Sequence, residues 1–224
     1  MQIIQDALKE GRDTLSEAES KRVLQAYKVP VTREIEVTDK EGLLKATGVI
    51  GFPLVIKGCG SKLSHKTERN LVRVGIPGEE EAVTAFEEIM ADVKADGGTV
   101  LVQEMIKGDR ELEAGLIRDP QFGPCVMFGL GGVFTEVLKD IIFRPAPLEK
   151  RDALQMINGI KSSKILGEVR KMPAADIDQL AGILMGLGQI GVEHDDVAEI
   201  DINPIILSEG KPVAVDGLVI LKSE

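Results

Sequence analysis

An alternating stretch near the C-terminus, residues 198–217, constrains the fold of this chain more than any other feature. Its sequence, AEIDINPIILSEGKPVAVDG, predicts a strand, a turn over Ser208–Lys211 and a returning antiparallel strand over residues 212–216. In a strand, alternate side chains point to opposite faces. We therefore expect a hairpin with one polar face and one face turned toward a core, the core face carrying Ile200, Ile202 and Ile205.

The polar face of this hairpin concentrates oxygen-bearing side chains. Asp201 and Asn203 are two residues apart and share a face, and the returning strand is expected to bring Asp216 close to them. Two carboxylates and an amide oxygen suit Mg²⁺ together with a bound phosphate. An ordinary hairpin with solvated acids on one face explains the pattern equally well.

The composition excludes several classes of protein. The chain has 224 residues, of which 43% are hydrophobic, so it is long enough and apolar enough to form a packed core. Its 27 Lys and Arg against 37 Asp and Glu leave a net charge of −10, which argues against nucleic-acid binding. The sequence contains no apolar run that approaches the length of a membrane helix, and its first residues do not resemble a signal peptide.

The two cysteines, Cys59 and Cys125, stand in different segments. So few cysteines favour a reducing compartment and free thiols, and they disfavour a disulfide framework or a zinc site. We therefore expect a cytoplasmic protein.

The order of the expected elements predicts an α/β (α+β) protein of two lobes. Ser16 and Glu19 form a capping box that opens a helix, Thr38 is expected to cap a second helix, and residues 159–172 are expected to form a loop or mobile segment. Further helices are expected over 79–95, 148–157 and 176–190, and strands over 31–37, 54–57, 71–76, 99–104, 112–117, 125–128 and 141–143. We divide the chain into an N-terminal segment with a smaller lobe, 1–102, and a larger lobe, 103–224.

Two residues in the first half are candidates for phosphate chemistry. Lys57 ends an apolar strand beside a glycine-containing loop, from which a lysine can reach a phosphate; an exposed lysine at a strand end is the simpler explanation. His65 follows that loop, and a neutral imidazole is a competent nucleophile toward phosphorus. An isolated histidine in a surface loop is, however, the commoner case.

Two further segments are compatible with nucleotide binding. Gln103–Ile106 leaves a strand and leads to Glu111, and such a crossing can offer backbone groups to an adenine edge, although a plain strand-turn-strand also fits. The glycines of Gly129–Gly132 let backbone amides approach an anion, but the segment is neither a Rossmann fingerprint nor a P-loop. The charged residues that follow it, Glu136, Lys139, Asp140 and Arg144, fit either a solvated strand face or the wall of a phosphate site.

Taken together, these segments resemble the beta subunit, or the equivalent fused domain, of the ADP-forming acyl-CoA synthetases, which are related to succinyl-CoA synthetase. The resemblance covers nearly the whole chain. It is carried by GFPLVIKGCGSKLSHKTE at 51–68, by the segment from VLVQEMIKG to FRPAPL at 100–148, by PAADIDQLAGIL at 173–184 and by AEIDINPIIL at 198–207.

The resemblance implies an ATP-grasp fold that holds a nucleotide between two lobes, and it implies a role for each candidate residue. Lys57 looks like the phosphate-contacting lysine and His65 like the histidine that is transiently phosphorylated. The other implied roles are the adenine hinge for Glu104, Met105 and Ile106, the ribose-side acid for Glu111, nucleotide contacts for Gly129, Gly131, Gly132 and Arg144, and the Mg²⁺ ligands for Asp201, Asn203 and Asp216.

The same resemblance implies a reaction and a partner. Acyl-CoA, ADP and phosphate would be converted reversibly to carboxylate, CoA and ATP. An alpha subunit would carry the CoA-binding domain and a second phosphohistidine, so that the active enzyme is a hetero-oligomer. The alternatives are a stand-alone ATP-grasp ligase that joins a carboxylate to an amine, and a nucleotide-binding regulatory module without turnover.

Overall fold

The chain divides into two compact units. The structure, a computed structural model, describes residues 1–61, 71–132 and 140–222. The first unit consists of Met1–Asp13, Ser20–Val31 and Ile106–Glu224, and the second of Thr14–Glu19 and Thr32–Met105. The chain therefore passes from the second unit to the first between Met105 and Ile106.

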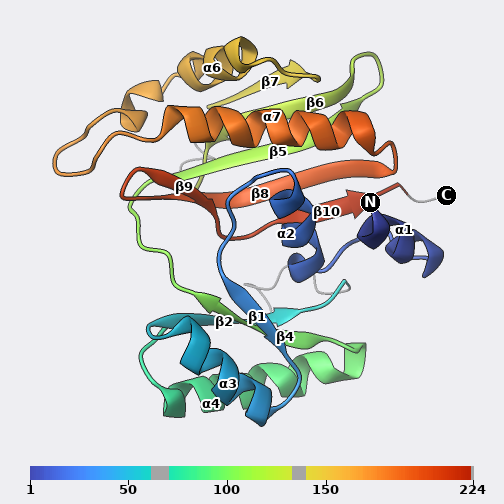
Figure 1. Cartoon of the computed structure of the whole chain (residues 1–224), viewed down its shortest axis with the longest axis vertical. Coiled ribbons are helices and arrows are strands. Elements are labelled where there is room, and N and C mark those ends of the chain that lie inside the picture. Colours follow the sequence, from blue (N-terminus) through green and yellow to red (C-terminus); the bar gives the residue numbers. More distant parts are fainter. Residues whose placement is uncertain (62–70, 133–139, 223–224) are drawn as a thin grey trace. The chain divides into compact units, whose positions relative to one another are not determined.

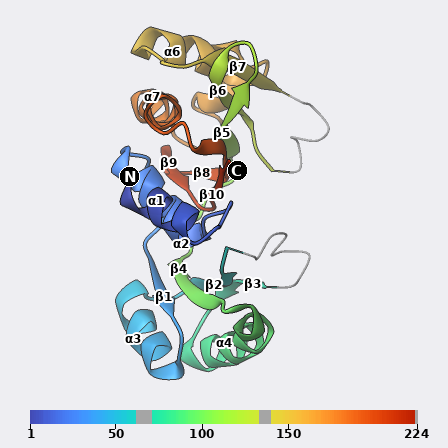
Figure 2. The same cartoon turned by 90° about the vertical axis from the view of Figure 1, so that its right-hand side faces the viewer.

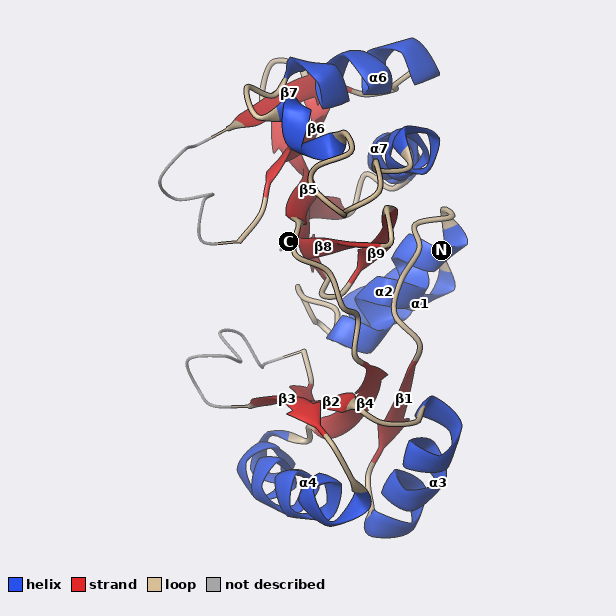
Figure 3. Cartoon of the chain, turned by 90° about the vertical axis from the view of Figure 1, so that its left-hand side faces the viewer, coloured by secondary structure: helices blue, strands red, loops and turns tan. Residues whose placement is uncertain are grey.

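The second unit is a four-stranded antiparallel sheet with two helices on one face (Figures 1 and 3). The strand order is β1-β4-β2-β3, so that β2 and β4 are the central strands. The strands are β1 (Glu34–Val37), β2 (Leu54–Cys59), β3 (Val72–Ile76) and β4 (Thr99–Glu104), and the helices are α3 (Lys40–Ile50) and α4 (Glu79–Val93), the latter continued by the 3₁₀ helix η1 (Lys94–Asp96).

Apolar spacing and capping explain the two helices of this unit. Helix α4 begins with three glutamates, which favour a helix N-terminus, and the residues at helical spacing that follow are buried against the sheet. Helix α3 is capped by Asp39, whose side chain accepts a hydrogen bond from Gly42 N at 2.7 Å. The expected cap at Thr38 is wrong by one residue, because a carboxylate at the next position reaches the free amides of the first turn.

The first unit is a six-stranded antiparallel sheet in which strand β8 is central to the candidate site. The main order is β10-β8-β5-β6-β7, and β9 also pairs with β8. The strands are β5 (Glu111–Asp119), β6 (Gly123–Leu130), β7 (Ile141–Pro145), β8 (Val197–Ser208), β9 (Lys211–Ala214) and β10 (Leu218–Leu221). Two helices, α6 (Lys150–Gly159) and α7 (Ile177–Glu193), lie along one face of this sheet (Figure 1).

Helix α7 confirms the helix expected over 176–190. Asp176 caps it by accepting from Gln179 N at 2.9 Å, and its apolar stripe of Leu180, Leu184 and Leu187 is buried. Gly191 lets the helix approach the sheet closely, because a Cβ there would stand 2.5 Å from a methyl carbon of Leu116. This contact assigns the even-numbered residues of β5 to the face covered by α7.

The predicted hairpin is confirmed. Strands β8 and β9 pair antiparallel from Ile205↔Ala214 to Ser208↔Lys211. The two residues of the turn, Glu209 and Gly210, both have positive φ, at 49° and 84°. Two-residue hairpin loops favour such a turn because its twist matches that of the strands.

The predicted inward face of β8 is also confirmed, although simple alternation does not explain it. Ile200, Ile202 and Ile205 are all buried. Ile205 pairs with Leu112 and Ile202 with Ala114, so between these two pairs β8 has one residue more than β5. This bulge restores the alternation and keeps all three isoleucines on the core side.

The segment expected to be a loop or mobile, 159–172, is held at two points. It contains the 3₁₀ helix η2 (Ser163–Leu166) and a bridge between Val169 and Met172. The buried Arg110 guanidinium donates to three backbone carbonyls in or beside this segment, those of Ile165, Gly167 and Pro173. The buried Asp140 carboxylate accepts from the amides of Lys161 and Ser162, each at 2.7 Å.

The N-terminal segment differs from the division expected at residue 102. Most of helices α1 (Gln2–Lys9) and α2 (Glu17–Ala26) belongs to the first unit, beside β10 (Figure 2). The reason is a set of long-range hydrogen bonds, among them Val219 N to Ser20 Oγ and Leu221 N to Asp13 O. None of the helices among the described residues has the length and apolar character needed to cross a membrane.

The first turn of α2, by contrast, belongs to the second unit. The predicted capping box is confirmed there: Glu19 N donates to Ser16 Oγ at 3.3 Å, and Ser16 N donates to Glu19 Oε2 at 2.8 Å. The two reciprocal bonds fix the start of the helix.

Candidate functional site

The predicted oxygen set lies where the edge of β8 is irregular. Asp201 pairs with Leu218 of β10 on one side, whereas β9 pairs only from Ile205 onward. Between β9 and β10 the chain crosses this gap, and Val215 N donates to Pro204 O at 3.0 Å. Asp216 therefore lies beside the part of β8 that carries Asp201 and Asn203, as the sequence predicted, although in a connection and not in the returning strand.

A further carboxylate, Glu113, lies on the other side of β8. It stands on β5 opposite the bulge of β8, at the Asn203–Pro204 step, and it is 6% exposed. Glu113 has the same strand parity as Gly115, which pairs with Asp201, so both acids lie on the face away from α7. Sequence reasoning missed Glu113, although an acid alternating with Leu112 and Ala114 is a signal that could have found it.

The electrostatics of these acids reflect crowding of negative charge. Burial, and then the charge of Asp201, raises the pKa of Glu113 to about 7. Burial also raises the pKa of Asp201, with further contributions from Glu199 and Asp216. Like charges and desolvation both favour the protonated form of a carboxyl group. A cation near these oxygens would favour their ionised forms.

The residues present fit a magnesium ion bound together with a phosphate. Carboxylate and amide oxygens are the ligands that Mg²⁺ takes in proteins, usually with phosphate oxygens and water completing its shell. Across residues 1–61, 71–132 and 140–222, no group of three or more His, Cys, Asp or Glu side chains could hold a metal ion. The set therefore depends on its amide, Asn203, and on oxygens brought by a ligand.

The glycine-rich segment is divided between two roles. Gly131 N donates to Glu111 O at 2.9 Å, and a Cβ on Gly132 would lie 2.6 Å from Glu111 Oε2, so these glycines and the predicted ribose-side acid are neighbours. Gly129 lies inside β6, where a Cβ would stand 2.7 Å from Asp140 O. Close strand packing therefore explains Gly129, and only Gly131 and Gly132 lie beside Glu111 beyond the strand.

Arg144 is not brought together with the other candidates. It pairs with Val126, whose methyl carbon lies near Gly188 of α7, so it is on the helix-covered face of the sheet. Its Nη1 donates to Asp152 Oδ1 at 3.3 Å and Gln155 Oε1 at 2.9 Å, both on α6. The sequence could not tell which face of β7 turns toward the helices, and the expected nucleotide contact of Arg144 has no support from its position.

In the second unit, Lys57 occupies the central strand β2 and is buried. Its Nζ donates to Glu17 Oε1 at 2.8 Å, and the two side chains are 6% and 0% exposed. The simpler explanation considered above, that Lys57 is an exposed lysine at the end of a strand, is therefore wrong. Sequence reasoning missed Glu17, because no local pattern connects two residues that are 40 positions apart.

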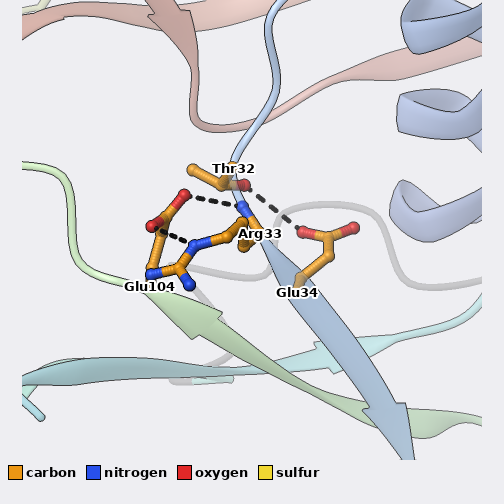
Figure 4. A network of polar contacts seen from close by, with 4 residues as sticks. All are labelled: Thr32, Arg33, Glu34 and Glu104. Carbon is orange, nitrogen blue, oxygen red and sulfur yellow. Dashed lines mark hydrogen bonds and ion pairs between the residues drawn. The ribbon is translucent and has the colours of Figure 1, made fainter. Parts of the chain in front are cut away.

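The predicted hinge begins at the end of β4, where Glu104 is tied to β1 (Figure 4). The Glu104 carboxylate accepts from Arg33 N at 2.7 Å and from Arg33 Nε at 2.8 Å, while Glu104 N donates to Arg33 O at 3.0 Å. Met105 and Ile106 follow, and both are half-buried. The side chain of Glu104 therefore holds the backbone of Arg33, the residue that precedes β1.

Three predicted residues lie outside the described residues. They are His65, in 62–70, and Glu136 and Lys139, in 133–139. Each of these stretches leads directly into described candidates, Lys57 on β2 in one case and Gly131–Gly132 in the other.

Comparison with known proteins identifies the family. The model of the ATP-grasp domain matches residues 6–221. The chain is 41% identical to ADP-forming acetate–CoA ligase I subunit beta of Pyrococcus furiosus over 98% of this chain and 97% of that protein. It is 36% identical to the ADP-forming acetate–CoA ligase I of Archaeoglobus fulgidus, of which it covers 33%.

Solved structures agree with these relatives. The dinucleotide-forming acetyl-coenzyme A synthetase 1 of Candidatus Korarchaeum cryptofilum superposes with a TM-score of 0.93 at 39% identity, covering 99% of each chain. The predicted ATP-grasp fold is therefore confirmed, and the chain belongs to the ATP-grasp family, among the beta subunits of the ADP-forming acetate–CoA ligases.

Proposed function

We propose that this chain is the nucleotide-binding subunit of an ADP-forming acyl-CoA synthetase and moves a phosphoryl group between a histidine and ADP. The observation that carries the proposal is the oxygen set on β8. Asn203 lies between the parts of β8 that pair with β10 and with β9, and Asp216 lies in the connection between β9 and β10, beside that stretch. A carboxylate and an amide at such a site are suited to a metal-bound phosphate.

In the first unit, Asp201, Asn203 and Asp216 hold Mg²⁺, and Glu111 binds the ribose. The metal, when bound, supplies positive charge for the phosphate oxygens during transfer. The backbone amide of Gly132 faces the phosphates, where the absence of a side chain permits close approach, while the amide of Gly131 stays bonded to Glu111 O. A solved structure of the Korarchaeum synthetase contains Mg-AMPPCP, which supports the binding of a magnesium-bound nucleotide by this family.

In the second unit, Lys57 contacts a phosphate of the nucleotide, and the backbone of Glu104 to Ile106 binds the adenine edge. The bonds between Glu104 and Arg33 support this role, since they hold the strand end that leads into the hinge. Preorganised contacts of this kind stabilise a transferring phosphoryl group without reorganising at the moment of reaction.

His65 carries the phosphoryl group between two sites. In the direction of ATP synthesis, the neutral imidazole attacks phosphorus, so that an N–P bond forms as the bond to the donor histidine of the alpha subunit breaks. An oxygen of the terminal ADP phosphate then attacks the same phosphorus, the N–P bond breaks, and ATP leaves. The alpha subunit supplies the CoA-binding domain, where phosphate and acyl-CoA form acyl phosphate and CoA. The donor histidine then attacks the phosphorus of acyl phosphate, an N–P bond forms as the bond from phosphorus to the acyl oxygen breaks, and the carboxylate leaves.

The proposed relay is tested by following labelled phosphoryl groups. The chain is incubated with γ-labelled ATP and Mg²⁺, with and without an alpha subunit, and acid-labile, base-stable label is located by peptide mapping. We expect label on His65. We also expect turnover of acetyl-CoA, ADP and phosphate only after the alpha subunit is added.

The variant His65→Ala separates the relay from binding. It should lose overall turnover and still bind ADP with unchanged affinity, because the carrier is lost and the nucleotide contacts remain. An active assembly that never labels His65, together with turnover by the alanine variant, would contradict the relay and favour a ligase that joins a carboxylate directly to an amine.

A further inference from the structure

We infer that Glu17 is a positioning residue for the phosphate-contacting lysine: its buried carboxylate holds the Lys57 ammonium in place for a nucleotide phosphate. This inference rests on the proposed role of Lys57. It starts from one contact, the 2.8 Å hydrogen bond between Lys57 Nζ and Glu17 Oε1, both in the second unit.

The pair lies on the face of the sheet that the unit does not use for its main core. Leu54 and Ile56 of β2 pack in the core cluster with α3 and α4, so Lys57 and Cys59 point to the opposite face. There Cys59 packs with Leu101 and with Ala18 of α2. The first turn of α2 therefore covers this part of the opposite face, and it brings Glu17 to Lys57.

The position of Glu17 is set by the local structure of that turn. The capping box formed by Ser16 and Glu19 fixes the turn on either side of Glu17. A carboxylate in the first turn of a helix is also stabilised by the helix dipole. The Glu17 carboxylate is thus in place before any nucleotide arrives.

A contribution to stability alone does not explain why a buried ion pair stands at this position. Replacing a buried ion pair by well-packed apolar side chains is often neutral or stabilising, because two charges must be taken out of water. The neighbouring Ala18, Cys59 and Leu101 show that apolar packing is available at this site. Binding of a ligand by Lys57 is a better explanation for keeping this lysine and its counter-ion at the site.

The geometry of an ammonium allows Lys57 to serve both partners. A lysine has three N–H donors, so one can remain with Glu17 while another reaches a phosphate oxygen. Glu17 then restricts the rotation of a long side chain in advance, which lowers the entropic cost of ordering it on binding. The expected consequence is a contribution to phosphate affinity, with no contribution to adenosine affinity.

The test compares ADP with adenosine, which lacks the phosphates. Binding of each to the full chain, with Mg²⁺ present, is measured by calorimetry for the wild type, Glu17→Gln and Glu19→Gln. We expect Glu17→Gln to weaken ADP binding about tenfold and to leave adenosine binding unchanged. Glu19→Gln is the matched control: it removes the same charge two residues away, and a glutamine can still complete the capping box. It should bind both ligands as the wild type does.

A double-variant cycle shows whether Glu17 acts through Lys57. In a Lys57→Met background, Glu17→Gln should weaken ADP binding no further. An equal loss of ADP and adenosine affinity in Glu17→Gln, or a further loss in the Lys57→Met background, would overturn the inference. If Lys57→Met itself binds ADP normally, the proposed phosphate role of Lys57 fails, and the inference fails with it.

The conservative variant Glu17→Asp covers the case in which Glu17→Gln does not fold, as judged by circular dichroism. It keeps the charge and withdraws it by one methylene. A folded Glu17→Asp protein should lose part of the ADP affinity and none of the adenosine affinity; normal ADP binding by this variant would overturn the positioning role.

Discussion

The two sheets of this protein present opposite chemistry on the faces that their flanking helices leave uncovered. In the second unit that face carries a cation, Lys57, held by a buried carboxylate of the same unit. In the first unit it carries acids: burial and then the charge of Asp201 raise the pKa of Glu113, and burial, Glu199 and Asp216 raise the pKa of Asp201. The second unit places a carboxylate beside its lysine, whereas the first unit places several carboxylates near one another.

The difference agrees with the proposed function, in which each unit binds a component of opposite charge. A paired cation is ready for an anion, because its desolvation has already been compensated within the fold. Crowded carboxylates are stabilised in their ionised form by a nearby cation. The proposed Mg²⁺–nucleotide complex carries both: a phosphate for Lys57 and a metal ion for the oxygen set.

The largest effect on stability should come from breaking the buried Lys57–Glu17 ion pair. Lys57→Met leaves the Glu17 carboxylate buried without its ammonium, and we expect a loss of about 3–5 kcal/mol in the free energy of unfolding. Urea denaturation followed by circular dichroism measures it. The double variant Lys57→Met/Glu17→Gln should recover much of that loss. Lys45→Met, which breaks the exposed Lys45–Glu41 pair on α3, should change stability by less than about 0.5 kcal/mol.

A second prediction tests the oxygen set of the first unit with its metal. Asn203→Ala should weaken binding of ADP in the presence of Mg²⁺ about tenfold, roughly 1.4 kcal/mol, and leave the fold intact, because Asn203 is exposed. Calorimetry with and without Mg²⁺ measures the change, and binding of ADP in excess chelator should be unaffected. Ser208→Ala, at the other end of β8, is the matched control. Unchanged affinity for ADP in the presence of Mg²⁺ would mean that this is an ordinary surface hairpin with no part in metal binding.

A third prediction concerns pH in the absence of Mg²⁺. The pKa of Glu113 is about 7 in the folded chain, against an ordinary value of 4.5. Between these values the folded state binds more protons than the unfolded state, so this group makes stability fall as pH rises through that window. Glu113→Gln should reduce the fall between pH 5 and pH 8 by on the order of 1 kcal/mol.

Urea midpoints at the two pH values measure this effect. Glu168→Gln, an exposed change elsewhere in the first unit, serves as the control for general charge effects. An identical pH dependence in wild type and Glu113→Gln would mean that the pKa of Glu113 is not raised in the folded chain.

The smallest expected effect belongs to an exposed pair in the second unit. The side chain of Arg33 is 65% exposed, so its bond to Glu104 is open to water and salt. Arg33→Ala should lower the free energy of unfolding by less than about 1 kcal/mol. The loss should shrink further at high salt. A loss as large as that of Lys57→Met would remove the distinction between buried and exposed pairs in this unit.

The sequence by itself determined the elements and the order of the candidate residues. Alternation and turn chemistry identified the hairpin of β8 and β9, and the capping box marked the start of α2, because both depend on residues close together in the chain. The same local signals brought Asp201 and Asn203 to one face and brought Asp216 beside them.

The tertiary structure decided which residues meet across long separations. It paired Lys57 with Glu17, placed Glu113 opposite the bulge of β8 at Asn203, and turned Arg144 toward α6, away from the acids. It also assigned α1 and most of α2 to the first unit through bonds to the C-terminal strand. None of these follows from local pattern, because strand register and the facing of an edge strand are fixed by packing between segments distant in sequence.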